Sequence, residues 1–298
     1  MNADHILTLI LAAGPAFATY YLAAIGHGIF EKSGVLNLAI DGVFTLGVAV
    51  AFSVSAVTMN ANLGLLASII ISTGLGVVIA YLTTKFPTSH GAIGLSTMFV
   101  GYGLASLIGV PVRSTTPNAA WYPINNWFWA LIILIAIGIG VLVHYMLRNT
   151  KLGSSIRAAG ENPYAASSLG VDILKVRLIA GAVGYALIGA GAALYVLAYT
   201  QSWSEGTGMG HGWVAFAVSL SAGRNALLTI LSAAVFGSLV NYGYSLQAVA
   251  NLSPHITNML PFIAALVALV VFEVTPLKRK LAPPKGLGKV YFKEERTV

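Results

Sequence analysis

The chain has 298 residues, of which 57% are hydrophobic and only 8% are charged. A soluble domain carries about 25% charged residues, so this composition excludes a soluble protein and indicates a multi-pass protein of the cell membrane. The net charge of +7 does not indicate nucleic acid binding. The basic residues cluster at 148–177 and 278–296, as they do on the cytosolic side of membrane proteins.

Long apolar runs follow one another along the chain, and a spanning helix needs about 20 such residues. Spans are predicted at 5–29, 35–59, 63–84, 92–110, 127–147, 178–199, 227–250 and 256–274. Between the sixth and seventh lies a glycine-rich loop at 201–212, followed by ten apolar residues at 213–222 that are too short to cross alone. We therefore expect an all-α polytopic membrane protein with about eight or nine transmembrane helices and one broken or re-entrant segment.

The longest polar break, at residues 148–177, contains a short helix with its own end signals. Asn162 suits the N-cap, Pro163 suits the first helical position, and Gly170 suits the residue after the C-cap. Two turns are too short to be stable alone, so this helix must pack against something. Two interpretations remain at this point: a connecting loop with one helical segment, or a docking helix on the cytosolic face.

Motifs for nucleotide, metal and covalent chemistry are absent from the sequence. The chain has no G-x-x-x-x-G-K-[ST], no H-E-x-x-H, no C-x-x-C and no G-x-S-x-G, and it has no cysteine. Its six histidines are scattered. We therefore expect neither a metal site nor a bound cofactor in this chain, and we find no catalytic set.

Polar residues inside apolar spans are candidates for a substrate pathway, because such groups in a membrane face protein or water. Asp41 lies one helical turn after Asn37, which predicts that both face the same side near the cytosolic end of a span. Asn241, Tyr244 and Ser245 share a face of the span 227–250. The alternative is that these groups only bridge neighbouring helices.

Four stretches resemble the permease subunits of ABC importers for nucleosides and simple sugars, of the branched-chain amino-acid and ribose permease superfamily. Residues 31–42 (EKSGVLNLAIDG) resemble the signature E-R-x-G-V-x-N-I-G-x-E-G. Residues 156–170 (IRAAGENPYAASSLG) resemble a cytosolic I-R-A-V-G-E-N-P-x-A-A-x-x-x-G segment. Residues 212–224 resemble G-F-I-A-L-A-A-V-I-F-G-R, and residues 282–296 resemble the A-P-x-x-L-G-x-P-Y-x-K-E-E-R ending.

This resemblance implies an ABC importer permease fold, with residues 1–298 as a single permease domain, a cytosolic coupling loop at 148–177 and a basic cytosolic tail at 276–298. It implies a second related permease as heterodimer partner, an ABC ATPase with two nucleotide-binding domains that holds ATP and Mg, and an extracytoplasmic substrate-binding lipoprotein. The short helix then becomes the coupling helix. The residues expected to couple to the ATPase are Arg157, Glu161, Asn162, Pro163, Tyr164, Ala165, Ala166, Leu169 and Gly170.

The function expected from the resemblance is a translocation path for nucleosides or simple sugars. The pathway residues expected are Asn37, Asp41, Trp213, Phe216, Asn241, Tyr244 and Ser245. A structural or gating role of Asp41 predicts that Asp41→Asn retains most transport. The alternative class is an ion-coupled secondary transporter of a small polar solute, in which Asp41 and the glycine break would form the site.

Overall fold

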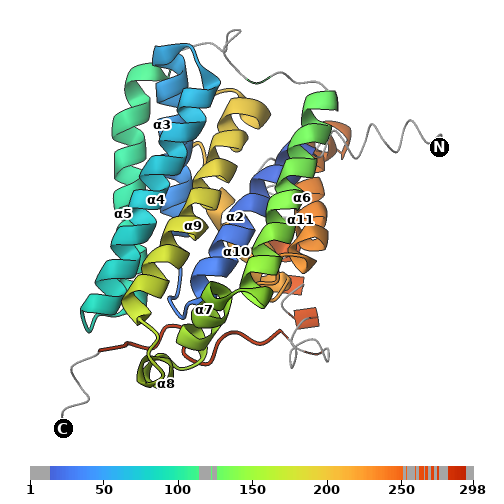
Figure 1. Ribbon diagram of the computed structural model, residues 1–298. Coiled ribbons are helices and arrows are strands. Elements are labelled where there is room, and N and C mark those ends of the chain that lie inside the picture. The colour runs from blue at the N-terminus through green and yellow to red at the C-terminus, as the bar shows by residue number, and fades with distance from the viewer. Residues whose placement is uncertain are drawn as a thin grey trace.

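The computed structural model describes residues 14–113, 122, 126–250 and 281–292, together with isolated positions between 253 and 274. Long helices lie side by side in one bundle, and two short helices cross one of its ends (Figure 1). The elements in chain order are α2 (Gly14–Lys32), α3 (Ile40–Thr58), α4 (Ala61–Lys85), α5 (His90–Gly109), the 3₁₀ turn η1 (Val110–Val112), α6 (Asn126–Asn149), α7 (Lys151–Glu161), α8 (Pro163–Ser168), α9 (Ile173–Leu194), the π-helical turn η2 (Tyr195–Thr200), α10 (His211–Ser221) and α11 (Leu228–Ala250).

Five of these helical stretches are long and apolar enough to cross a membrane: Ile40–Thr58, Ala61–Lys85, His90–Val112, Trp127–Asn149 and Ile173–Thr200. The structure thus agrees with an all-helical polytopic membrane protein. The total of eight or nine spans stays a prediction, because the last predicted span at 256–274 lies mostly outside the described residues. The first predicted span, at 5–29, begins outside them, and its helix continues to Lys32.

Helix α2 forms the centre of the bundle, and all its residues except Lys32 are buried. It packs against α6, α9, α10 and α11. Small residues allow its backbone to touch that of α9: a Cβ atom on Gly26 would lie 2.1 Å from the carbonyl oxygen of Gly184. Most side chains of α2 are apolar, as expected of a helix in such an enclosed position.

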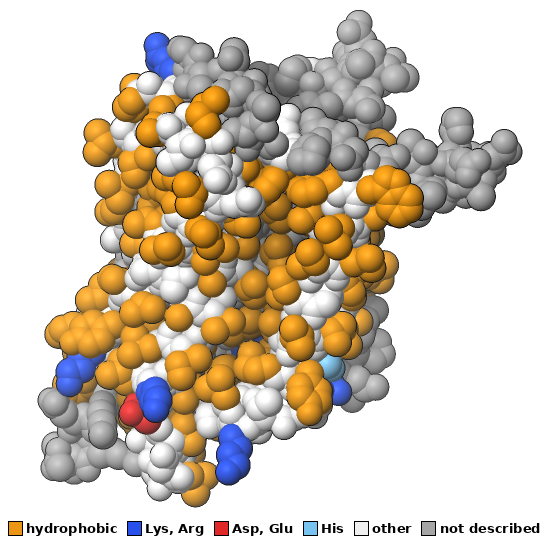
Figure 2. All heavy atoms as spheres, turned by 45° about the horizontal axis from the view of Figure 1, so that its top comes forward, with side chains coloured by type: hydrophobic (Ala, Val, Ile, Leu, Met, Phe, Trp, Pro, Cys, Tyr) orange, Lys and Arg blue, Asp and Glu red, His pale blue; other side chains and the backbone are white. Residues whose placement is uncertain are grey.

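The outer helices present apolar side chains to their surroundings. Ile70 of α4, Leu107 of α5, Leu142 of α6 and Leu231 of α11 are each about seven-tenths exposed. Figure 2 shows hydrophobic side chains over most of the visible flank, with Lys and Arg gathered mainly toward one end. This distribution is the one expected of a surface in contact with lipid.

The polar segment 148–177 holds two short helices, α7 and α8, where we expected one. Thr150 caps α7, because its Oγ1 accepts the N–H of Gly153 at 3.1 Å. The expected loop is also shorter than predicted at its C-terminal side. Asp172 caps α9 by accepting the N–H of Lys175 at 3.0 Å, so Arg177 lies inside α9, where it is fully buried.

Candidate translocation site

The first feature of the site is a buried break between α2 and α3. Residues 33–39 are not helical, and Asn37 therefore lies outside both helices and shares no helix face with Asp41. This corrects the expectation that 35–59 is one continuous span. Gly34 allows the chain to turn out of α2, since its φ of +89° is unfavourable for other residues.

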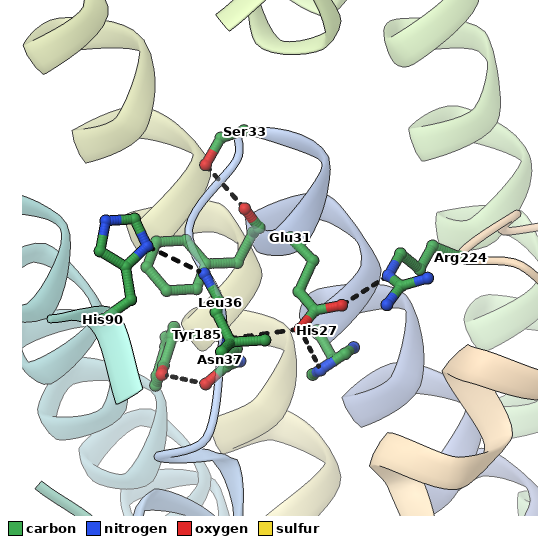
Figure 3. A network of polar contacts seen from close by, with 9 residues as sticks. His27, Glu31, Ser33, Leu36, Asn37, His90, Tyr185 and Arg224 are labelled. Carbon is green, nitrogen blue, oxygen red and sulfur yellow. Dashed lines mark hydrogen bonds and ion pairs between the residues drawn. The ribbon is translucent and has the colours of Figure 1, made fainter. Parts of the chain in front are cut away.

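Polar side chains satisfy the backbone of this break (Figure 3). The N–H of Leu36 donates to Nδ1 of His90 at 3.3 Å, and the N–H of Asn37 donates to Oε1 of Glu31 at 3.3 Å. Arg177 Nε donates to the carbonyl of Ser33 at 3.2 Å. Irregular backbone inside a membrane protein is stable only with such internal partners, so these three side chains explain how the break persists.

A buried ion pair connects the break to the end of α10. Arg224 Nε donates to Oε2 of Glu31 at 2.5 Å, and His27 Nε2 lies 3.4 Å from Oε1 of the same carboxylate (Figure 3). The Glu31 side chain is fully buried. We did not predict this pairing from the sequence. The available signal was that both charges stand inside the quoted motifs, Glu31 in the last turn of α2 and Arg224 after the short apolar segment at 213–222.

The second break is the one predicted from the glycines. Gly206, Gly208 and Gly210 all have φ between +87° and +100°, and α10 begins directly after them. At 11 residues α10 is about 16 Å long at 1.5 Å per residue, roughly half of a membrane crossing. This short helix after a glycine break agrees with the expected broken or re-entrant segment.

Asp41 joins the two breaks. It lies in the first turn of α3, and its carboxylate accepts the N–H of Gly210 at 3.0 Å and the N–H of Trp213 at 3.2 Å. The hydroxyl of Tyr102 donates to the same carboxylate. Asp41 therefore caps the N-terminus of α10, where a negative charge is favoured by the helix dipole.

The position of Asp41 differs from the one expected near the cytosolic end of a span. Its neighbour Gly42 packs against Met98 and Gly101, which lie in the middle part of α5. Asp41 is also almost fully buried. The sequence could not place it, because the break that delays the start of α3 consists of apolar residues that resemble a span.

Aromatic side chains surround the start of α10. The ring of Trp213 lies 5.5 Å from that of Phe216, and the imidazole of His27 lies 4.8 Å from Phe216. His211 bridges two tyrosine hydroxyls, with Nδ1 2.6 Å from Tyr20 and Nε2 2.8 Å from Tyr195. The structure thus brings Asp41, Trp213 and Phe216 together, and it adds Tyr102 and His211, which carried no distinctive sequence signal.

Two of the other expected pathway residues, Asn37 and Asn241, can be placed in the structure. Asn37 Oδ1 accepts the hydroxyl of Tyr185 at 2.6 Å, so Asn37 contacts α9. Asn241 is half-buried on α11. Tyr244 and Ser245 are also on α11, but their side chains fall outside the described residues.

The expected coupling segment contains the end of α7, the whole of α8 and the turn after it. Asn162 caps α8 by accepting the N–H of Ala165 at 3.0 Å, Pro163 is its first residue, and Gly170 has φ of +86°. These local predictions are confirmed. Leu169 is 85% exposed, whereas Ala166 is buried at 3%. Arg157, Glu161 and Ala165 are exposed and Tyr164 is half-buried.

Comparison with known proteins assigns this chain to a family. Residues 10–270 match the family described as the permease component of the branched-chain amino acid transport system. A putative glucose ABC transporter permease of Haloferax volcanii is 27% identical, over 96% of this chain and 98% of that protein. A nucleoside ABC transporter permease of Lactococcus lactis is 26% identical, over 99% and 100% respectively.

A solved structure supports the fold. PsaBC from Streptococcus pneumoniae, in complex with a Fab, aligns with a TM-score of 0.55 and 14% identity, over 91% of this chain and 92% of that one. The family match decides against the secondary transporter and the membrane enzyme. The chain belongs to the permease-component family of the branched-chain amino acid transport system, and it is the multi-pass permease subunit of an ABC importer, which acts with an ATPase and a substrate-binding protein.

Proposed function

We propose that this permease carries a neutral polar solute, a nucleoside or a simple sugar, along a path beside α10 and α11. The observation that supports it best is the capped start of α10 within the bundle. There Asp41 occupies the backbone N–H groups of Gly210 and Trp213 that would otherwise attract an anion. An anionic solute is disfavoured beside this carboxylate, whereas the aromatic rings of Trp213 and Phe216 suit a sugar or base face.

The names of the relatives agree with this class of solute. They include permeases for glucose, for nucleosides and, in Bacillus subtilis, for guanosine. We propose that this chain works with the three partners that the family resemblance implies. ATP and Mg bind to two nucleotide-binding domains of the ATPase, a second related permease completes a heterodimer, and an extracytoplasmic lipoprotein delivers the solute.

The test is uptake by the complete complex in proteoliposomes. Labelled guanosine, ribose and glucose are offered with the binding protein, with and without ATP and with an ionophore. We expect uptake of at least one of these neutral solutes that requires ATP and survives collapse of the ion gradient. Uptake abolished by the ionophore in the presence of ATP, or no ATP-driven uptake of any of the three solutes, would refute the proposal.

Cysteine accessibility locates the path, since the natural chain has no cysteine. Cysteines at Phe216, Asn241, Tyr244 and Ser245 are expected to react with a charged, water-soluble thiol reagent at rates that change during ATP turnover. The physical reason is that a solute path is hydrated, whereas polar groups that only bridge helices are dry. Reaction rates are measured by mass shift with and without ATP.

Two controls match these positions. Val214 lies on the buried side of α10 at 4% exposure, and Leu231 lies on the outer side of α11 at 70%. Cysteines at both are expected to stay unreactive, the first because protein covers it and the second because it faces lipid. If all four test positions stay unreactive in every nucleotide state, the path lies elsewhere.

We also propose that α8 docks on the ATPase as a coupling helix. Ala165 and Leu169 provide its exposed apolar surface, and Ala166, the other position expected from the sequence, packs inward. Ala165→Asp with Leu169→Asp is expected to leave membrane insertion intact and to reduce ATP-driven uptake at least tenfold, because two charges replace an apolar contact. Ala165→Ser with Leu169→Met is the matched uncharged control. Normal substrate-stimulated ATP hydrolysis in the Asp variant would contradict docking at α8.

A further inference from the structure

Residues 281–292, the tail segment, run past α7 and α8 at the end of the bundle (Figure 1). This segment contacts elements that are far apart in the sequence. It reaches the end of α10, where a Cβ atom on Gly223 would lie 2.4 Å from Cβ of Leu281. It also reaches the corner between α7 and α8, where the N–H of Lys285 donates to Oε2 of Glu161 at 3.4 Å.

Two backbone hydrogen bonds join the tail segment to Gly160 and to Gly34, which also contact each other. The N–H of Gly286 donates to the carbonyl of Gly160 at 2.9 Å, and the N–H of Gly288 donates to the carbonyl of Gly34 at 3.1 Å. Gly160 and Gly34 also touch directly, since a Cβ atom on Gly34 would lie 3.1 Å from Cα of Gly160. The tail segment therefore bonds the end of α7 to the start of the 33–39 break.

Tyr291 connects the coupling helix to a buried cation. Its ring is 4% exposed and lies 5.1 Å from the ring of Tyr164 in α8. On the other side, the guanidinium carbon of Arg177 lies 5.8 Å from the Tyr291 ring centroid. Arg177 is fully buried and donates to the carbonyl of Ser33. A cation beside an aromatic ring is stabilised by it, more so away from water.

These contacts form a continuous series from the surface to the site. It runs from Tyr164 through Tyr291 and Arg177 to Ser33, where the break begins. The break leads into the first turn of α3, where Asp41 caps α10. Packed and hydrogen-bonded groups of this kind move together, because a close-packed interior deforms little. A shift of α8 against the bundle therefore acts on the break through the tail segment.

We propose that the tail segment is the part through which movement of α8 reaches the 33–39 break, with Tyr291 as the positioning residue between Tyr164 and Arg177. The proposal rests on the proposed coupling function of α8. It assigns to residues 281–292 a role in energy coupling, which goes beyond anchoring the end of the chain.

The test compares variants of Tyr291 in the complete complex, by the number of solute molecules imported per ATP hydrolysed. Tyr291→Ala is expected to reduce this ratio at least fivefold while ATP hydrolysis continues, because the ring between Tyr164 and Arg177 is lost. Tyr291→Phe keeps the ring and is expected to keep the wild-type ratio. Val290→Ala is the matched control, because Val290 is 42% exposed on the same segment. A wild-type ratio in Tyr291→Ala, or an equal defect in Tyr291→Phe, would overturn the proposal.

A cross-linking measurement is independent of the folding of the Tyr291 variants. Cysteines at Glu161 and Lys285 are joined by a short thiol-specific linker, and uptake is compared before and after linking. We expect the same linking rate with and without ATP, and the same uptake by the double-cysteine complex before and after linking, because the two segments move as one body. State-dependent linking, or loss of uptake on linking, would show that they separate. A wild-type complex without ATP-driven uptake would instead refute the proposed function.

Discussion

Arg224→Met is expected to destabilise the permease by about 3–5 kcal/mol, because it leaves the buried carboxylate of Glu31 without its cation. The Glu31 side chain has no exposed surface, so water cannot replace the lost partner. The remaining contacts, His27 and the N–H of Asn37, are longer, at 3.4 and 3.3 Å. The measurement is the thermal unfolding midpoint in detergent, together with the yield of monodisperse protein.

A double variant separates the effect of leaving Glu31 unpaired from the other effects of removing the Arg224 side chain. Arg224→Met combined with Glu31→Gln removes both charges, and it is expected to be more stable than Arg224→Met alone, since no unpaired charge remains. Lys151→Met is the control for losing a cation, because Lys151 is exposed and such changes are usually within about 0.5 kcal/mol. A double variant less stable than Arg224→Met would contradict the ion-pair account.

Asp41→Asn is expected to reduce ATP-driven uptake about tenfold or more. This replaces the expectation from the sequence that the variant retains most transport because Asn has the same shape as Asp. The carboxylate accepts three hydrogen bonds, and Asn can accept on one oxygen only. If that oxygen faces Tyr102 and Gly210, the amide N–H₂ faces the N–H of Trp213, and two donors oppose each other. A lost hydrogen bond to a charged group is worth about 1.5–3 kcal/mol, and the start of α10 becomes poorly fixed.

Tyr102→Phe is the graded comparison for this prediction. It removes one donor and leaves both backbone N–H groups on Asp41, so its defect is expected to be smaller than that of Asp41→Asn. Uptake is measured in proteoliposomes, with an ionophore present to exclude a role of the proton gradient. Wild-type uptake in Asp41→Asn would show that capping of α10 is unimportant for transport.

Local signals in the sequence were sufficient to predict the elements whose ends are marked by glycine, proline or capping residues. The glycines at 206, 208 and 210 predicted the break before α10, and Asn162, Pro163 and Gly170 predicted α8. In both cases, the backbone conformation follows from residue types that favour it locally. The family could also be recognised, because four motifs retained their spacing.

The break at 33–39 could not be predicted, because nothing local distinguishes it from a span. Its residues are mostly apolar, and its hydrogen-bond partners, such as His90 and Arg177, come from distant parts of the chain. The same limit applies to the pair of Glu31 and Arg224, which are separated by 193 positions. Hydropathy reports how well a residue tolerates lipid, and it does not report which backbone groups find a partner elsewhere.

The enclosure of α2 has a consequence for biosynthesis. This helix is synthesised before α6, α9, α10 and α11, the four helices that later surround it, and Arg224 follows Glu31 by 193 residues. This innermost helix is therefore inserted before them, while Arg224, the cation that pairs with Glu31, has not yet been made. Truncated chains that end before Arg224 leave the Glu31 carboxylate without its cation inside the bilayer, so we expect them to be removed by proteolytic quality control in the membrane.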